Sequence, residues 1–422
     1  MQTSLPRLRI RATHLPTVPP SFVDCTQQNS PVSDSVSDPS ADRQGGLGTT
    51  CEIRGQTRQD RYALQNVARS VLMGQASPKG KAYRLLNCQR ATGHDAKGVD
   101  LLQGPKGSRF GNLQTCGSVW TCAFCAAKIM RHREGEIQQA MDAHRKAGGR
   151  CVMVTLTHSH RRTDKLAPMV DGYAKAARSM KSYRAFKAIR KGIGYVGEIR
   201  ALEVTWGDAS GFHPHGHELW FIEGDQTMEQ LEALRLAVFD QWAKACERAG
   251  LPAPSQKHGV DVSVAWSAAE YMAKFSRDQK WGAGKELTRA HSKRAGAKGE
   301  RYTPFDFLRA IEVGHRPAQM TELFREYAHA YHGRRQLHWS SGLKDRFGID
   351  DVSDEEAVEE SEAAHTVAGT ISLFDWRERV MKQGRDCRSA ILEIHERDGM
   401  EAVHRFIAAL PIGGRFTKEK PS

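Results

Sequence analysis

The stretch IRALEVTWGDASGFHPHGHELWFI, from Ile199 to Ile222, decides the fold and holds the candidate site. In its first part, apolar and polar side chains alternate with a period of two, which is typical of a β-strand. Residues Gly207 to Gly211 (GDASG) are turn formers, and the alternation resumes after them. The stretch therefore predicts two strands joined by a short loop.

Three histidines occupy alternate positions of the second strand, at His213, His215 and His217. Since alternate side chains of a strand share a face, the three imidazoles point the same way. Neutral imidazoles with a carboxylate make a usual ligand set for a divalent ion, and Glu203 on the first strand is the natural carboxylate. We predict His215, His217 and Glu203 as ligands, with His213 as a further candidate ligand or a neighbour.

Two imidazoles and one carboxylate with open positions suit Mg²⁺ or Mn²⁺ held beside a phosphate, and such a set also binds Zn²⁺. Whether Glu203 faces the histidines depends on the strand register, which the sequence leaves open. The alternative is that the histidines are satisfied core residues of an ordinary strand.

The composition favours a polyanionic partner. The chain has 422 residues, with 62 Lys and Arg against 49 Asp and Glu and a net charge of +13, so nucleic acid is the first candidate. The sequence has no run of about 18 apolar residues, so it predicts no membrane span. Its N-terminal residues show no secretory signal. These features predict a cytoplasmic protein without a membrane partner.

The cysteines indicate a second metal site. There are nine in the chain, and the segment CGSVWTCAFCAAKI contains Cys116, Cys122 and Cys125. A C-x2-C pair places two thiolates on one tight turn, which is half of a usual tetrahedral zinc site. Cys116 and the isolated Cys88 would complete a structural Zn²⁺ site, and the alternative is a group of buried, reduced cysteines.

A third segment, SAAEYMAKFS, predicts the start of a helix at Ser267. Ser267 and Glu270 have the spacing of a capping box, while Tyr271 and Lys274 share a face three residues apart. A metal that polarises a phosphodiester, a tyrosine and a basic surface together suggest phosphoryl transfer through a covalent intermediate. Tyr271 is the candidate nucleophile and Lys274 the candidate phosphate-positioning group, although tyrosine at such a position is also a usual packing residue.

A row of basic residues recurs at every third position of a helix predicted from about Pro168 to Lys191. Phosphate contacts and a merely solvated charged face are both open interpretations of this row. Its members are Lys175, Arg178, Lys181, Arg184, Lys187 and Arg190.

Taken together, these motifs resemble those of the rolling-circle replication initiators (Rep proteins) of bacterial plasmids, a branch of the HUH endonucleases. The match lies in their order along the chain. VTLT (Val154–Thr157) resembles the first motif, ALEVTWGDASGFHPHGHELWF (Ala201–Phe221) the second, and EYMAKF (Glu270–Phe275) the third. The cysteine segment and HWSSGLKDRFGI also look like that family, so the resemblance spans roughly Cys88 to Ile349.

The resemblance implies an α+β fold with a central antiparallel sheet flanked by helices. The residue patterns themselves add a small cysteine-rich zinc-binding element and a helical C-terminal region. The resemblance also implies an endonuclease that nicks one strand of a plasmid origin, presented as a single-stranded or cruciform site. Tyr271 would become joined to the 5′-phosphate and release a 3′-hydroxyl primer, and the strands would later be rejoined. A host helicase and a polymerase are candidate partners, and a homodimer is one assembly compatible with this function.

The sequence departs from the family at Ser267, where some plasmid members have a glutamate one turn before the tyrosine. The termination nucleophile is therefore open. Two other functions stay in view: a relaxase or transposase with the same chemistry, and a zinc-containing DNA-binding regulator without catalysis.

Composition divides the chain into four expected parts. Residues 1–60 predict a disordered tail, 61–149 a cysteine-rich element with a helix, and 150–349 the nicking and strand-transfer domain. Acidic residues are dense from Asp350 to Glu362, so residues 350–422 predict an acidic linker followed by helices.

Overall fold

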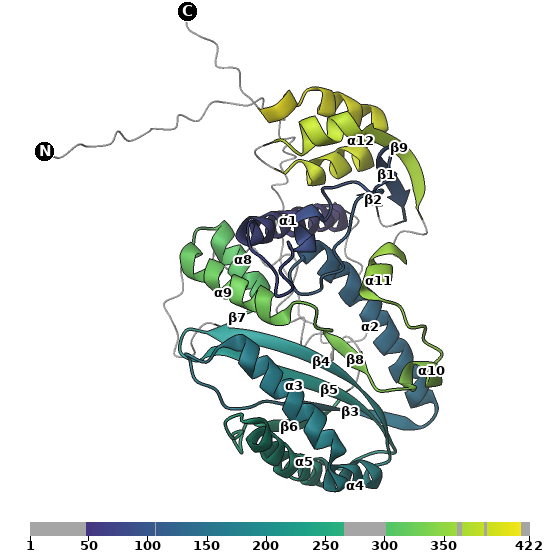
Figure 1. Cartoon of the computed structure of the whole chain (residues 1–422). Helices are drawn as coiled ribbons and strands as arrows, with labels where there is room; N and C mark the ends of the chain where they lie inside the picture. The colour runs from purple at the N-terminus through teal and green to yellow at the C-terminus, as the bar shows by residue number, and fades with distance from the viewer. Residues whose placement is uncertain (1–47, 106, 266–300, 361–364, 384–385, 415–422) are drawn as a thin grey trace, which may run out of the picture. The chain divides into compact units, whose positions relative to one another are not determined.

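The computed structural model describes residues 48–105, 107–265, 301–360, 365–383 and 386–414 (Figure 1). Residues 1–47, most of the expected tail, lie outside this range. Among the described residues, no helix combines the length and apolar character that crossing a membrane requires.

The main sheet contains the predicted hairpin. Its strand order is β6-β3-β5-β4-β7, with β8 pairing with β4 at the same edge as β7, and every pairing is antiparallel. The strands are β3 (Gly149–Leu156), β4 (Tyr195–Gly207), β5 (Gly211–Glu223), β6 (Val260–Val264), β7 (Arg301–Tyr302) and β8 (Leu337–Trp339). The prediction of an α+β protein with an antiparallel sheet and flanking helices is confirmed.

The turn between β4 and β5 depends on Gly211. Gly207 pairs with Gly211, and Gly211 has a φ of 75°, a left-handed conformation that glycine adopts without a Cβ clash. A Cβ at this position would also lie 2.6 Å from the carbonyl oxygen of Arg162. The turn residues seen in the sequence therefore meet both a conformational and a steric requirement.

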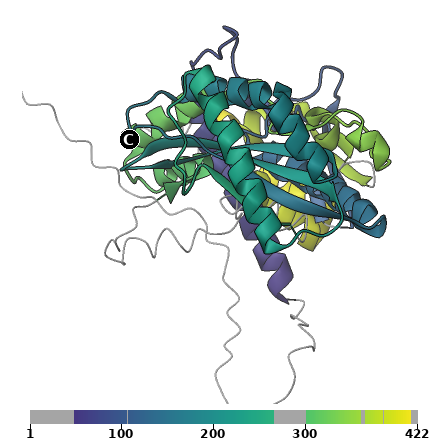
Figure 2. The ribbon, with the colours of Figure 1, turned by 90° about the horizontal axis from the view of Figure 1, so that it is seen from below.

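Helices cover both faces of the main sheet (Figures 1 and 2). On one face, α3 (Leu166–Ser182), α4 (Arg184–Gly192) and α5 (Met228–Ala249) bury Val152, Val154 and Trp220. On the other, α2 (Ala123–Lys146) contributes to the core that contains Met153, Leu219 and Phe221. Neighbouring residues of one strand thus enter different cores, because successive side chains of a β-strand point to opposite faces of the sheet.

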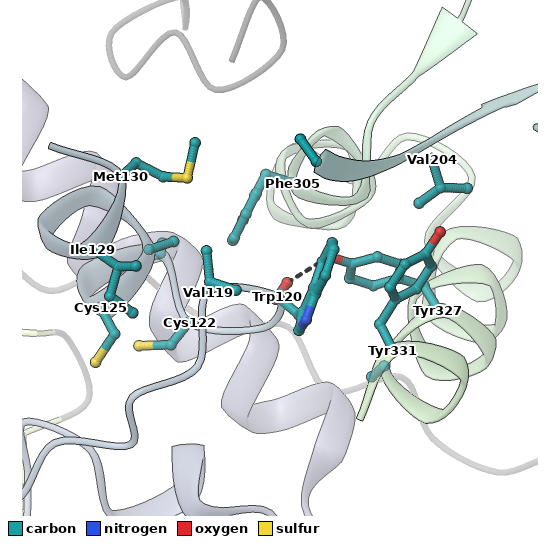
Figure 3. Close-up of a cluster of buried hydrophobic side chains, with 14 of the residues drawn as sticks. Val119, Trp120, Cys122, Cys125, Ile129, Met130, Val204, Phe305, Tyr327 and Tyr331 are labelled. Atoms are coloured by element: carbon teal, nitrogen blue, oxygen red, sulfur yellow. Dashed lines mark hydrogen bonds between the residues drawn. The ribbon is translucent and has the colours of Figure 1, made fainter. Parts of the chain in front are cut away.

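The second core extends to α1 (Gly48–Leu72), α8 (Pro304–Glu312) and α9 (Pro317–Tyr331). Trp120 lies at the junction, where its ring packs 4.4 Å from that of Tyr331 and its carbonyl accepts a hydrogen bond of 2.9 Å from Tyr327 Oη (Figure 3). These two contacts connect the cysteine segment to α9.

One predicted helix is in fact two. The stretch expected to run from about Pro168 to Lys191 breaks at Tyr183, whose ψ of 135° is extended. The break lets α4 turn Phe186 and Arg190 onto the sheet, where Phe186 packs against Trp220. Two members of the basic row, Lys181 and Arg190, are ion-paired with the buried carboxylate of Glu198, so the row is not a single solvated face.

A smaller sheet joins distant parts of the sequence. Its order is β2-β1-β9, all antiparallel, with strands β1 (Gly98–Gly104), β2 (Gly107–Phe110) and β9 (Thr366–Ser372). It shares a core with the π-helix η2 (Asp375–Val380) and with α12 (Arg388–Ala408). The expectation that the C-terminal region is only helical missed β9, because a seven-residue segment with a central glycine becomes a strand through its distant partner β1.

The first described helix also begins earlier than expected. α1 starts at Gly48, inside the segment 1–60 that the composition assigned to a tail. Its later residues Leu64, Ala68 and Leu72, spaced by four, are buried in the core of the cysteine element. Packing of these residues, rather than the polar first turns, accounts for the helix.

Short elements complete the described chain. They are the 3-10 helices η1 (Arg84–Asn87) and η3 (Ile412–Gly414), and the helices α10 (Leu343–Arg346) and α11 (Asp354–Glu360).

The packing around Gly216, the residue between His215 and His217, can be tested by substitution. A Cβ on Gly216 would be 1.9 Å from Tyr173 Oη of α3, so we expect Gly216→Ala to lower the free energy of unfolding by about 1–3 kcal/mol. The buried Tyr173 hydroxyl has no hydrogen-bond partner among the described residues, so Tyr173→Phe should be neutral or stabilising. Urea unfolding of both single variants and the double variant measures this. Because Tyr173 Cζ would also lie 2.8 Å from the new Cβ, the double variant should recover only part of the loss, and a double variant less stable than Gly216→Ala would contradict the clash.

Candidate metal centres

The register of the hairpin brings Glu203 directly opposite His215. The Oε2 atom of Glu203 lies 3.2 Å from His215 Nε2 and 2.9 Å from His217 Nε2. Ligand atoms that share one ion at about 2.1 Å lie roughly 3 Å apart, so these separations suit a common divalent ion. The structure thus brings three of the four predicted residues together.

The other ring nitrogens of both histidines are already engaged. Nδ1 of His217 lies 2.9 Å from Thr155 Oγ1 on β3, and Nδ1 of His215 lies 3.0 Å from the backbone carbonyl of His213. A hydrogen bond at one imidazole nitrogen fixes the ring and directs the other nitrogen. Both Nε2 atoms therefore face the same carboxylate oxygen.

Glu203 is held in its charged form. Burial by itself raises the pKa of this carboxyl, but hydrogen bonds and charge from His215 and His217 outweigh burial and lower it to about 2. Its side chain is only 10% exposed. An ionised carboxylate next to two imidazoles in a nearly dry position has the chemistry of a ligand for a hard or borderline cation.

His213 lies on the same strand face but outside this trio. Its Nδ1 is 2.8 Å from Nε2 of His160, in the segment that follows β3. Burial, followed by the nearby imidazoles of His215 and His160, lowers the pKa of His213 to about 3, so the ring is neutral. The geometry favours the role of a neighbour for His213.

Thr155 and His160 are two contacts that the sequence reasoning did not single out. Thr155 lies in β3, directly beside β5 in the sheet, and His160 lies in the segment that follows the end of β3. Thr155 pairs directly with His217 in the sheet. The sequence can point to this contact only after β3 is known to lie beside β5.

The four predicted cysteines form a second cluster. Sγ of Cys88 lies 3.7 Å from that of Cys122 and 3.6 Å from that of Cys125, and the Cys116–Cys125 separation is 3.7 Å. All four Sγ atoms lie within 4.8 Å of one another, and the residues are buried. Four thiolates about 2.3 Å from a central zinc ion stand roughly 3.8 Å apart at tetrahedral corners, so the arrangement fits zinc.

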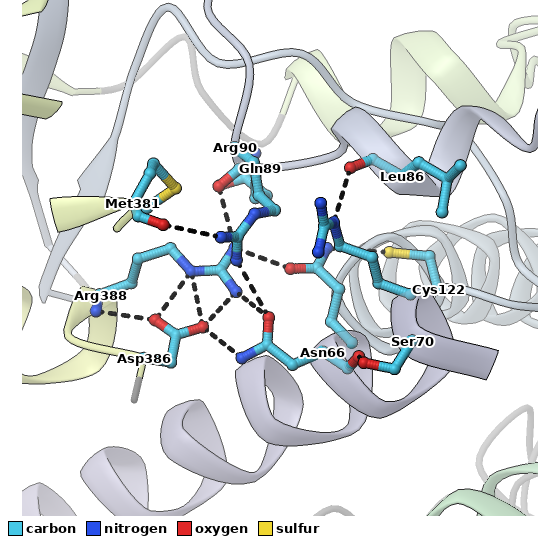
Figure 4. Close-up of polar contacts among 11 residues, drawn as sticks. Asn66, Ser70, Leu86, Gln89, Arg90, Cys122, Met381, Asp386 and Arg388 are labelled. Carbon is cyan, nitrogen blue, oxygen red and sulfur yellow. Dashed lines mark hydrogen bonds and ion pairs between the residues drawn. The ribbon is translucent and has the colours of Figure 1, made fainter. Parts of the chain in front are cut away.

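A buried polar chain supports this four-cysteine cluster (Figure 4). Gln65 on α1 donates to Cys122 Sγ at 3.3 Å, and its own Oε1 accepts a hydrogen bond of 2.8 Å from Arg388 on α12. The fully buried Arg388 is ion-paired with Asp386 and donates 2.9 Å to the carbonyl of Gln89. A donor to a thiolate offsets its negative charge, so the C-terminal helix supports the cysteine cluster through Gln65.

The third predicted motif lies outside the described residues. Ser267, Glu270, Tyr271 and Lys274 all fall within 266–300. The described chain ends before this segment just after β6, which pairs with β3, and resumes at β7, which pairs with β4. The segment is therefore joined to strands on both sides of the hairpin.

The fold and the two clusters define an α+β protein with a His-His-Glu centre on an antiparallel sheet and a four-cysteine centre beside it. Residues 108–243 match the family described as "Replication protein". The matched range contains Glu203, His215 and His217 together with three of the four cysteines.

Two curated relatives are similar to parts of the chain. "Protein rep" of Streptomyces lividans is 33% identical over 300 residues, covering 56% of this chain and 64% of that protein. A "Neomycin resistance protein" of Streptomyces cyanogenus is 30% identical over 136 residues, covering 26% of this chain and 31% of the relative. The matches span less than two thirds of either relative, and no solved structure matches. The resemblance to plasmid Rep replication proteins, predicted from the order of the motifs, is confirmed.

The four-cysteine cluster predicts a measurable zinc content. Purified protein should lose about one zinc per chain when Cys125 is replaced by alanine, because three thiolates no longer close a structural site. Elemental analysis gives the ratio. Cys246→Ala is the matched control, since Cys246 is buried in α5 away from the cluster and should leave the zinc content unchanged. Equal zinc in the two variants would contradict the assignment.

The buried hydrogen bonds that connect α12 to the four-cysteine cluster predict a large effect on the free energy of unfolding. Arg388→Met leaves Asp386 without its ion-pair partner at a buried position, and such a loss costs about 3–5 kcal/mol in the free energy of unfolding. Arg397→Met, on the exposed part of the same helix, should have little effect. Urea unfolding with and without a zinc chelator measures both variants. Similar stability of the two would show that the buried network does not hold the cluster region together.

Proposed function

We propose that the chain initiates rolling-circle replication of a plasmid by binding the origin and nicking one DNA strand. The observation that carries the proposal is the convergence of Glu203, His215 and His217 in a segment that matches replication proteins. The net charge of +13 suits DNA as the partner.

A divalent ion bound by these three residues, Mg²⁺ or Mn²⁺, would polarise and orient the scissile phosphodiester. Glu203 would offset its charge, and the hydrogen bonds that His217 Nδ1 makes to Thr155 Oγ1 and His215 Nδ1 makes to the His213 carbonyl keep both imidazoles in ligand orientation. Because the three ligand atoms come from two adjacent strands, they approach from one side, which leaves the opposite side for a phosphate oxygen.

In the proposed reaction, Tyr271 attacks the phosphorus atom after losing its proton. A bond forms between the tyrosine oxygen and the 5′-phosphate, and the bond to the 3′-oxygen breaks, so a 3′-hydroxyl is released as a primer for a host polymerase. Lys274 positions the phosphate and balances its charge. Attack of a 3′-hydroxyl on the phosphotyrosine reverses these steps and rejoins the strands.

Termination by a glutamate one turn before the tyrosine does not fit this sequence, which has Ser267 at that position. Reversal of the tyrosine step needs no such residue. A host helicase, a polymerase and a second copy of the chain remain proposed partners in a bacterial cytoplasm.

A covalent-adduct assay tests the proposal. Wild-type protein incubated with single-stranded origin DNA and Mn²⁺ should give a protein–DNA adduct that denaturing electrophoresis detects, and Tyr271→Phe should give none because it lacks the nucleophilic oxygen. Lack of an adduct with the wild type, or an undiminished adduct with Tyr271→Phe, would contradict the catalytic function. Duplex binding without nicking would instead support a non-catalytic regulator.

The metal ligands are tested in the same assay. His215→Ala together with His217→Ala should abolish nicking while leaving duplex binding largely intact, because the phosphate loses its metal and the basic surface is unchanged. His213→Ala is the matched comparison and should weaken nicking less, since His213 contributes no atom to the trio. Nicking that survives the double substitution would show that the trio does not bind the catalytic metal.

A further inference from the structure

A cleft lies beside the four-cysteine cluster, on a part of the protein that the nicking chemistry does not use. It has a volume of about 860 Å³. Its walls come from the turn before η1, the cysteine segment, the end of α9 with β8, and the acidic stretch leading into α11. None of the residues of the His-His-Glu trio lines it.

One wall is a short basic turn. Ala76 bridges to Ala82, and Ser77 both donates to the Lys81 carbonyl and accepts from Gly80, at 2.8 Å each. Gly80, with a φ of 70°, allows the tight reversal. The turn presents Lys79 and Lys81 as exposed side chains on the cleft wall.

The facing wall carries a third cation, Arg335, in the loop after α9. The two walls are tied together where Tyr83 packs edge-on against His332, with ring centroids 5.6 Å apart. Burial lowers the pKa of His332, and the nearby charge of Lys79 lowers it further, which places the two walls within electrostatic reach. Lys79, Lys81 and Arg335 make no ion pair with any other described residue.

Other cations of the cleft are already paired. Arg84 contacts Glu355 at 2.7 Å, Arg334 contacts Asp171 at 2.6 Å, and Lys344 contacts Glu136 at 3.0 Å. The acidic residues that line the cleft come from α10, the segment before α11 and α11 itself, whereas the cations without an ion pair come from the basic turn and the loop after α9.

The aromatic rings of the cleft are not free to stack on bases. Trp120 is 6% exposed and packs on Tyr331, and Lys344 lies 5.5 Å from the centre of the Trp339 ring. Binding of unpaired bases relies on open aromatic faces, whereas the backbone of duplex DNA is recognised by exposed Lys and Arg. The chemistry of the cleft therefore favours a phosphodiester backbone in a duplex over a single strand.

We infer that this cleft binds the phosphate backbone of duplex DNA through Lys79, Lys81 and Arg335, and that it is a contact surface separate from the nicking site. The inference extends the proposed function, since a nickase has to hold the duplex that flanks its target strand. It gives the four-cysteine cluster a role: the cluster fixes the cysteine segment that forms the floor between the two basic walls.

The test compares two sets of exposed cations in the full chain. The cleft variant is Lys79→Ala, Lys81→Ala and Arg335→Ala together. The matched variant removes the same charge from exposed residues of α4, by Arg184→Ala, Lys187→Ala and Lys191→Ala. Arg184 and Lys187 belong to the basic row, so this variant also tests the phosphate contact that the sequence left open there. Fluorescence anisotropy with a labelled origin duplex, in buffer without added Mg²⁺ or Mn²⁺ so that nicking does not intervene and without a chelator that would remove zinc, gives Kd over a series of salt concentrations.

The cleft variant should bind about tenfold or more weakly near 100 mM salt, and the slope of log Kd against log salt should fall by about two to three, roughly 0.9 for each phosphate that the variant no longer neutralises. The α4 variant should stay within about twofold of wild type. Duplex binding by the cleft variant at wild-type strength, or an equal loss in the α4 variant, would overturn the inference. Zinc content and the thermal transition confirm that both variants are folded.

A nicking assay on a single-stranded origin oligonucleotide separates this inference from the proposed function. The cleft variant should nick at close to the wild-type rate, because a single strand does not need the duplex contact. Loss of this activity in the folded cleft variant would overturn the separation of the two surfaces. If wild-type protein itself fails to nick, the proposed function fails, while the anisotropy comparison still decides whether the cleft binds duplex DNA.

Discussion

The pairing of β4 with β5 is the constraint on which the candidate site depends. Because side chains alternate along a strand, a shift of one residue would move Glu203 to the opposite face from His215 and His217. The register is held by the tight turn at Gly211 and by apolar residues of opposite parity that enter two different cores. The same core packing that stabilises the sheet therefore also aligns the three ligand atoms.

The sheet also fixes the orientation of the His215 and His217 imidazoles. Thr155 reaches His217 from β3 on the other side of β5, while the backbone of His213 engages His215 within β5. Three adjacent strands thus determine which nitrogen of each ring faces Glu203. A ligand set held in this way needs little reorganisation when an ion binds, which suits the proposed role of a metal that orients a phosphate.

Much of this centre was predictable because the information is local. The alternation in ALEVTWG and in the histidine strand, together with GDASG between them, predicted a hairpin, whereas its register, which places Glu203 opposite His215, came only from the structure. Contacts from outside the hairpin were not predictable in this way. Thr155 and His160 depend on β3 lying next to β5, and Gln65 and Arg388 reach the cysteines from segments 323 residues apart in the chain. For the same reason β9 was missed, since only its pairing with β1 makes it a strand.

The two metal centres differ in a way that follows from their ligands. Four buried thiolates at this spacing would enclose a bound ion completely, which suits a structural role for the four-cysteine cluster. The His-His-Glu trio supplies three ligand atoms from two adjacent strands of one sheet and leaves the remaining coordination positions open. Because a reaction needs an open coordination position and a scaffold needs a closed one, the two ligand sets suit the two roles proposed for them, catalysis at the sheet and structural support at the cysteine element.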